Sequence, residues 1–381
     1  MIRQLIERIT QPVGPPLPRP EPEPRLEPSP YLHVSEEAVH NPMTDRTVAP
    51  GEADFRLLQE VLRGGRPPSS LPAEDRDRLR RDGWLYDPDD LEDLTRGFYL
   101  KYVSLEAHTV CNQSCYFCPV SVAPREPHFM PMDQYREILR QLGAYRSTIE
   151  AVFMIAYNEP TLDKRFVEQV RAIREAGLQP ATLTNGSGLT PERVDALVEM
   201  GGLRFLSINL STMDREAYRR DRGKDQAELV LRNLEHARDL PVAEQMDIVV
   251  LGPGDDRHQR DFEEICERFA GSRFSVKHFV VNDRAGLLEI GTRAEGSQKP
   301  LRGCDLMGSR PIQHLHVDPY ARCILCCQDY HGTHVVGDLN ESTVEEVLTG
   351  PVMRRMRKMI YGLEEAPPDF ICRNCAFAIT G

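Results

Sequence analysis

The chain has 381 residues, of which 40% are hydrophobic and 28% charged, with a formal charge of −12. These values are typical of a soluble globular protein of two or three domains, and the acidic balance argues against a general nucleic-acid surface. No hydrophobic run reaches membrane-spanning length, and the opening MIRQLIERITQPVG lacks the apolar core of a signal peptide, so we expect a cytoplasmic protein with no membrane partner.

The N-terminal part divides into a proline-rich segment and a short helical one. The stretch from Gln11 to Pro30 holds nine prolines in twenty residues, so it lacks amide donors and apolar area. We therefore expect residues 1–50 to be disordered. Helical patterns over about 52–62 and 73–81 follow, separated by GGRPPSS. They predict a small helical or winged-helix-like module over residues 51–100.

From residue 101 to about 295, short β-rich runs alternate with helical periodicity. Helical faces recur between the runs, for example at Tyr135, Ile138, Leu139 and Leu142. Six strand–helix repeats predict a parallel sheet covered by helices, although periodicity does not separate an open sheet from a barrel. The predicted strands are 103–107, 151–156, 181–184, 205–210, 247–251 and 276–281.

The first predicted strand leads directly into the segment CNQSCYFCP, which contains Cys111, Cys115 and Cys118. Their C-x3-C-x2-C spacing can hold three irons of a four-iron cluster and leave the fourth iron open to a small chelating molecule. The alternatives are a zinc knuckle and three unrelated core cysteines. His108 and His128, the nearest histidines, lie outside familiar finger spacings. A reducing compartment also favours metal ligation over disulfides.

This motif and its placement resemble the radical S-adenosylmethionine (radical SAM) enzymes. The resemblance implies a partial six-stranded (β/α) barrel with its site at the carboxyl ends of the strands. It also implies a 4Fe-4S cluster whose open iron binds S-adenosylmethionine (SAM), and reductive cleavage of SAM to a 5′-deoxyadenosyl radical. The N-terminal module is similar to the peptide-binding domains of some peptide-modifying members, and the alternative for it is a packing cap.

The resemblance further implies a set of SAM-contacting residues after successive strands. Phe117 takes the aromatic position near the adenine. Tyr157-Asn158-Glu159-Pro160 replaces the family's Gly-Gly-Glu-Pro, which leaves Asn158 and Glu159 at the methionine ammonium group. Each predicted SAM contact, taken alone, is also compatible with an ordinary turn or surface residue. The prediction depends on the order in which these residues follow successive strands. The remaining implied contacts are Asn185, Asn209, Ser211 and Arg222, with Arg284-Ala285-Gly286 as a further candidate.

Six more cysteines lie beyond residue 300. The region 296–381 resembles the auxiliary-cluster domain called SPASM, or its shorter twitch form, and implies a second 4Fe-4S cluster held by Cys304, Cys326, Cys372 and Cys375. Ala321 stands where the turn glycine usually is, so Cys327 or Cys323 is an alternative ligand. A zinc ribbon is the alternative site. Cys266 fits a packed helix face instead. The nearby histidines His314, His316, His331 and His334 are candidate proton or substrate contacts or plain structural residues.

Together these features predict a radical SAM enzyme that abstracts a hydrogen atom from an organic substrate while the auxiliary cluster aids oxidation. Small-molecule dehydrogenation and peptide maturation both fit, so the expected partners are a small-molecule or peptide substrate and a reductant such as flavodoxin or ferredoxin. No catalytic acid or base is identified. The alternative function is a non-catalytic iron–sulfur or zinc protein acting as a redox sensor or scaffold.

Overall fold

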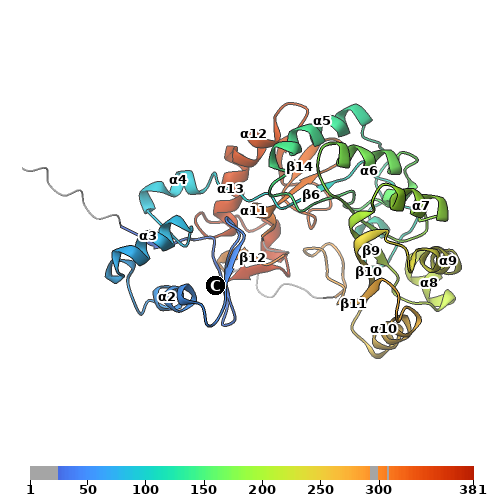
Figure 1. Cartoon of the computed structure of the whole chain (residues 1–381), viewed down its shortest axis with the longest axis horizontal. Coiled ribbons are helices and arrows are strands. Elements are labelled where there is room, and N and C mark those ends of the chain that lie inside the picture. The colour runs from blue at the N-terminus through green and yellow to red at the C-terminus, as the bar shows by residue number, and fades with distance from the viewer. Residues whose placement is uncertain (1–24, 292–298, 307–308) are drawn as a thin grey trace, which may run out of the picture.

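The computed structural model describes residues 25–291, 299–306 and 309–381. At its centre is a nine-stranded sheet of order β11-β10-β9-β8-β7-β6-β13-β14-β15 (Figure 1). Strands β6 to β11 run parallel to one another, which confirms the predicted α/β class with its large parallel sheet. Their bounds are β6 Tyr102–Leu105, β7 Ala151–Phe153, β8 Pro180–Thr184, β9 Leu203–Asn209, β10 Ala243–Gly252 and β11 Phe274–Val280.

Helices cover the outer side of this sheet because one face of each is apolar. In α5 the buried residues are the predicted Tyr135, Ile138, Leu139 and Leu142, which recur at helical spacing and pack on the strands. None of the described helices is long and apolar enough to cross a membrane. The barrel helices are α5 Met132–Leu142, α6 Phe166–Glu175, α7 Pro191–Glu199, α8 Arg215–Arg222, α9 Ala227–Ala237 and α10 Asp256–Arg268.

The C-terminal region extends the barrel sheet. Strand β13 (His314–Val317) pairs in parallel with β6, placing His316 opposite Ser104. Strands β14 (Arg322–Ile324) and β15 (Val335–Asp338) then add antiparallel. Ala321, at the β13–β14 turn, has a φ of 64°, the left-handed conformation that glycine normally supplies. The predicted boundary near residue 296 lies outside the described residues.

The remaining C-terminal elements pack beside this hairpin. Strand β12 (Leu301–Cys304) pairs antiparallel with β16 (Ala378–Thr380) and sets Cys304 opposite Ala378. The pairing therefore brings the first cysteine of the region next to the last ones. The helices are α11 Arg310–Gln313, α12 Val344–Thr349 and α13 Pro351–Ile360.

The N-terminal part of the described chain, residues 25–100 and called the N-terminal module from here on, is partly a β structure. Strands β2 (His33–Val34), β3 (Val39–Asn41) and β4 (Arg46–Val48) form an antiparallel sheet, and β1 (Glu27–Pro28) pairs with β5 (Leu85–Tyr86). The expected disorder is therefore wrong for residues 25–50: the dense prolines end near residue 30, and residues such as Val39 are buried beyond it. Residues 1–24 lie outside the described residues. The helices are α2 Ala53–Leu62, α3 Ala73–Arg81 and α4 Leu91–Leu94.

Candidate functional site

The first cysteine set lies at the carboxyl edge of the parallel sheet. Cys111, Cys115 and Cys118 are free thiols on the loop that leads from β6 into a 3-10 turn at Pro119–Ser121. Burial raises the pKa of Cys111 to about 12, and the thiols of Cys115 and Cys118 add to that rise. The three sulfur atoms are thus within electrostatic reach of one another. Binding a metal would replace their protons.

The donor set of this loop fits an iron–sulfur cluster by its chemistry. Within the described ranges, no three His, Cys, Asp or Glu side chains lie close enough together to hold a single metal ion. In a four-iron cluster, each thiolate binds a different iron rather than one common ion. Soft thiolates are the ligands that such a cluster uses, and in this structure a buried cation lies beside them.

That cation is Arg222, on which several predicted residues converge. It ends α8 and is only 1% exposed. Its Nη2 donates to Ser211 Oγ at 3.2 Å and to Asn209 Oδ1, and its guanidinium carbon lies 5.6 Å from the centre of the Phe117 ring. The structure thus brings together four residues that were predicted from three separate segments.

The same arginine holds the cysteine loop. Its Nη1 donates to Gln113 Oε1 at 3.2 Å and lies 3.9 Å from Cys115 Sγ. The Arg222 carbonyl accepts from the Ser114 amide at 3.0 Å. Gly223, which ends α8 with a φ of 66°, leaves room for this approach, since a Cβ there would lie 2.2 Å from Ser114 Oγ.

Glu159 joins two other loops at the same edge. Its buried carboxylate accepts from Thr161 N, Thr161 Oγ1, Thr184 Oγ1 and Asn185 N at 3.1, 2.5, 2.6 and 2.6 Å. Its own amide donates to the Val110 carbonyl, directly before the cysteine loop. Burial raises the pKa of this carboxyl, and the hydrogen bonds oppose the rise. Glu159 therefore sets the position of the loops after β6, β7 and β8.

The two predicted asparagines near Glu159 face different partners. Asn185 Nδ2 donates to Asn112 Oδ1 at 2.8 Å, so it touches the cysteine loop. Asn158 is turned toward His108, with 3.4 Å between Asn158 Nδ2 and His108 Nε2. Sequence reasoning missed Asn112 and Gln113. Their position inside the cysteine motif could have indicated them, because residues between cluster ligands hold the loop in place.

The second cysteine set surrounds one small apolar cavity. Of the three alternatives left open by the sequence, Cys326 lines it and neither Cys327 nor Cys323 does, while the Cys327 thiol also lies within electrostatic reach of Cys304 and Cys375. Burial raises the pKa of Cys375 to about 12, and the Cys304 thiol is among the groups that raise it further. Cys323 instead lies fully buried on β14 in the hydrophobic core. The cysteines that line the cavity are Cys304, Cys326, Cys372 and Cys375.

Tyr157 connects the two cysteine sets. Its hydroxyl donates to the carbonyl of Cys327, next to Cys326. Burial raises the pKa of Tyr157 well above its usual value; the Arg284 cation opposes this rise, and Cys327 and Cys118 add to it. Arg284, whose φ of 53° is left-handed, lies over the same ring at 5.9 Å. This tyrosine replaces a glycine of the expected motif and fills the space between the two sets.

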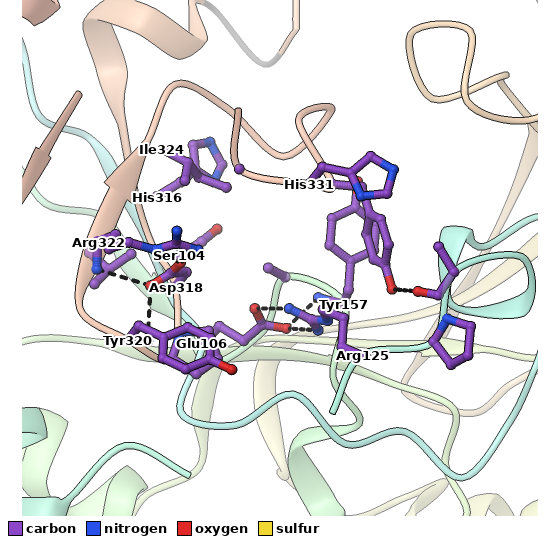
Figure 2. Close-up of a pocket in the computed structure, with 17 residues that line it drawn as sticks. Ser104, Glu106, Arg125, Tyr157, His316, Asp318, Tyr320, Arg322, Ile324 and His331 are labelled. Carbon is purple, nitrogen blue, oxygen red and sulfur yellow. Dashed lines mark hydrogen bonds and ion pairs between the residues drawn. The ribbon is translucent and has the colours of Figure 1, made fainter. Parts of the chain in front are cut away.

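A cavity of about 230 Å³ lies between the barrel and the β13–β14 hairpin (Figure 2). Figure 2 shows His316 and Ile324 on one side and Tyr157 and Arg125 on the other. Burial raises the pKa of Cys118, and the Arg125 guanidinium is one of the groups that oppose this, so the cavity wall borders the first cysteine set.

Comparison with known proteins finds a family model that matches the barrel region and another that matches the C-terminal region. Residues 105–269 match the family model described as Radical SAM superfamily, and residues 304–376 match that described as an iron–sulfur cluster-binding domain, SPASM. These two ranges contain all seven cysteines of the two sets and the predicted SAM-contacting residues from Phe117 to Arg222, whereas the further candidate Arg284-Ala285-Gly286 lies between them.

Individual relatives differ in reaction and in coverage. The chain is 23% identical over 277 residues to an S-adenosyl-L-methionine-dependent 2-deoxy-scyllo-inosamine dehydrogenase of Niallia circulans, covering 72% of this chain and 91% of the relative. It is 29% identical over 191 residues to a probable GTP 3′,8-cyclase of Pyrococcus abyssi, covering 49% and 56%. The crystal structure of Streptococcus suis SuiB bound to precursor peptide SuiA superposes with a TM-score of 0.54 at 12% identity, covering 87% and 90%, which shows a shared fold.

Proposed function

We propose, from the premise that this chain is an enzyme of the radical SAM superfamily with a C-terminal SPASM domain, that it oxidises an organic substrate held near its two cysteine sets. Such an enzyme binds a 4Fe-4S cluster, SAM and a second iron–sulfur cluster, which supply a 5′-deoxyadenosyl radical and an electron acceptor. The chain's own residues supply ligands, orientation and exclusion of water.

The two cysteine sets provide the ligands in this proposal. Cys111, Cys115 and Cys118 hold the first cluster and leave one iron for SAM. The burial of Cys115 and the electrostatic reach of the three thiols to one another support this role. The second cluster is held by the four cysteines that line the small C-terminal cavity, Cys304, Cys326, Cys372 and Cys375. An enclosed apolar setting suits a cluster whose charge is delocalised over iron and sulfur.

The residues around the first set bind SAM. Phe117, Arg222, Asn209 and Ser211 form one wall, in which the arginine also neutralises thiolate charge at Cys115. Asn185 reaches the same cysteine loop from another segment, through its hydrogen bond to Asn112.

Glu159 and Asn158 act differently from the expectation that both contact the methionine ammonium group directly. The Glu159 carboxylate already accepts four protein hydrogen bonds, so it positions the loops around the methionine group. Asn158 supports His108 behind it.

The oxidation removes two electrons and two protons from the substrate. One hydrogen atom would leave the substrate to the radical that bound SAM supplies, one proton would pass to a base, and one electron would pass to the cluster that the second cysteine set would hold. The observation that carries this proposal is the contact between Tyr157 and Cys327, because it links the barrel loop beside the first set to the second set. Reduced flavodoxin or ferredoxin supplies the electron that starts each cycle.

Peptide maturation is a second candidate, and the N-terminal module favours it. Its three-stranded sheet has the order β2-β3-β4, so in the described part of the chain β2 and β4 each keep one unpaired edge. Extended peptides add to such edges through backbone hydrogen bonds. A peptide bound there would bring its reactive residue to the barrel for the same hydrogen-atom abstraction.

The experiment is an anaerobic assay of iron and nucleoside. Reconstituted protein should hold two four-iron clusters, about eight irons per chain, and should form 5′-deoxyadenosine from SAM and dithionite. Cys111→Ala should abolish the nucleoside, while Cys372→Ala should keep it and lose the iron of the second cluster. A redox sensor or zinc protein would bind metal and form no nucleoside in either the parent or the variants.

A further inference from the structure

We propose that the cavity between the barrel and the β13–β14 hairpin binds the substrate, and that this substrate is an uncharged, polyhydroxylated ring held by His316. The inference rests on the proposed function, because it names the ligand of that same oxidation. Four features of the cavity carry it: its polar group without a partner, its charge balance, its aromatic wall and its size.

His316 lacks a hydrogen-bond partner in the described structure, as does Nε of Arg125, which also lines the cavity. It is 1% exposed, lines the cavity, and is stacked on His314 with ring centroids 4.0 Å apart. Among the described residues, neither of its ring nitrogens has a hydrogen-bond partner. Burial holds the pKa of His316 well below its usual value, so the ring is neutral. A neutral imidazole offers one donor and one acceptor, the pair that a hydroxyl or a vicinal diol satisfies.

The charges of the cavity wall are already paired. Glu106 takes two hydrogen bonds from Arg125, at 2.6 and 2.8 Å, and a third from the Tyr157 amide at 2.8 Å. Asp318 is paired with Arg322, whose Nε and Nη2 lie 2.8 and 2.7 Å from the single oxygen Oδ2. An ionised ligand would therefore lose its hydration without gaining a counter-charge. The balance favours a ligand without net charge.

Aromatic rings form the opposite wall and the opening. Tyr157 and Tyr330 pack edge to face with centroids 4.7 Å apart, and each lies near the Arg125 guanidinium. Tyr320, 44% exposed, marks the solvent side together with His331. Rings of this kind pack well against the C–H face of a saturated ring while leaving its hydroxyl edge free.

The size of the cavity limits the ligand. Its volume of about 230 Å³ corresponds to roughly eight water molecules at the density of the liquid. That suits a single ring and excludes several peptide residues. A peptide would have to bind outside this cavity.

The test uses myo-inositol as the probe and anaerobic protein with both clusters, without SAM or reductant. Saturation-transfer NMR and calorimetry should show binding of myo-inositol to the parent protein. His316→Phe keeps the ring and removes both nitrogens, so its dissociation constant should rise at least about tenfold. Cyclohexanecarboxylate, a charged ring of similar size, should bind at least about tenfold more weakly than myo-inositol.

Two further variants guard against loss of the fold. Ile324→Trp leaves His316 in place and fills the cavity, so it should abolish binding. His236→Phe, on the exposed face of α9, should bind like the parent. Absence of binding of myo-inositol to the parent at about 10 mM, above the range of weak specific ligands, overturns the proposal. Folded His316→Phe and Ile324→Trp proteins that bind myo-inositol as tightly as the parent overturn it as well. Because no SAM is cleaved here, this outcome is independent of 5′-deoxyadenosine formation, which tests the proposed function.

Discussion

Arg222 Nη1 lies 3.9 Å from the sulfur of Cys115, and the same guanidinium reaches Asn209 and Ser211 through Nη2. One buried cation thus contacts a predicted cluster ligand and two predicted SAM contacts. The same guanidinium makes both sets of contacts while fully buried. Cluster electronics and SAM affinity are therefore expected to change together when it is altered.

Arg222→Met should lower the reduction potential of the first cluster and weaken SAM binding. A hydrogen bond to a charged group contributes about 1.5–3 kcal/mol, so its loss weakens SAM binding. The substitution also removes a positive charge beside a thiolate, which disfavours the more negative reduced state of the cluster. The measurements are an EPR-monitored redox titration and SAM binding by calorimetry. Arg219→Met, on the exposed side of α8, should change neither quantity. Loss of only one of them would contradict the shared role.

Glu159→Gln should destabilise the loops that Glu159 joins. An amide group presents donors where the carboxylate accepts from Thr161, Thr184 and Asn185. Each mismatched buried group costs about 1–3 kcal/mol. The free energy of unfolding in urea should fall by about that amount, with weaker SAM binding. Glu137→Gln, an exposed carboxylate on α5, is the matched control and should lie near the parent.

Cys326→Ser and Cys327→Ser form a matched pair of neighbouring substitutions. Only Cys326 lines the cavity with Cys304, Cys372 and Cys375. Cys326→Ser should lose about four irons and the signal of the second cluster, whereas Cys327→Ser should keep both. Iron analysis and Mössbauer spectroscopy decide between them. The reverse pattern would move the ligand to Cys327.

His33 makes the docking of the N-terminal module dependent on pH. Its Nε2 lies 3.0 Å from the Tyr361 hydroxyl that follows α13, and burial lowers the pKa of His33 to about 4. The unfolded chain, with a pKa near 6.5, binds the extra proton first as pH falls. The contribution of His33 to stability is complete above pH 6.5 and is lost as the pH falls to about 4.

The unfolding free energy of His33→Phe should therefore depend less on pH across this window than that of the parent. Between pH 6.5 and 4 the parent should lose up to about 3 kcal/mol more than the variant. Urea unfolding at several pH values measures this. His236→Phe, on the exposed face of α9, should retain the slope of the parent. A parent-like slope in His33→Phe would show that another group controls it.

Local sequence patterns were enough to predict the barrel strands, the helix faces and the cysteine motif. Each of these depends on spacing within a short segment, as in the loop of Cys111, Cys115 and Cys118. The pairing of β13 with β6 could not be predicted in this way, because it joins residues about two hundred positions apart and depends on tertiary packing. Its HLHV sequence also places histidines where a strand core usually has apolar residues.

The candidate site shows the same division. Phe117, Asn209 and Ser211 were predicted individually, but their meeting at Arg222 needed the fold. The proposal of Cys326 rather than Cys327 as a ligand depends on which side chain lines a cavity built from distant segments. His316 was one of several histidines near the hairpin until its two nitrogens proved to be without partners in the described structure.

The central claim is that the cluster at Cys111, Cys115 and Cys118 has one iron open to SAM. EPR spectroscopy of the reduced, anaerobic protein with and without SAM tests it most directly. SAM should change the signal that disappears in Cys111→Ala and leave unchanged the signal that disappears in Cys372→Ala. A spectrum in which SAM changes neither signal, or only that of the second cluster, would contradict the account.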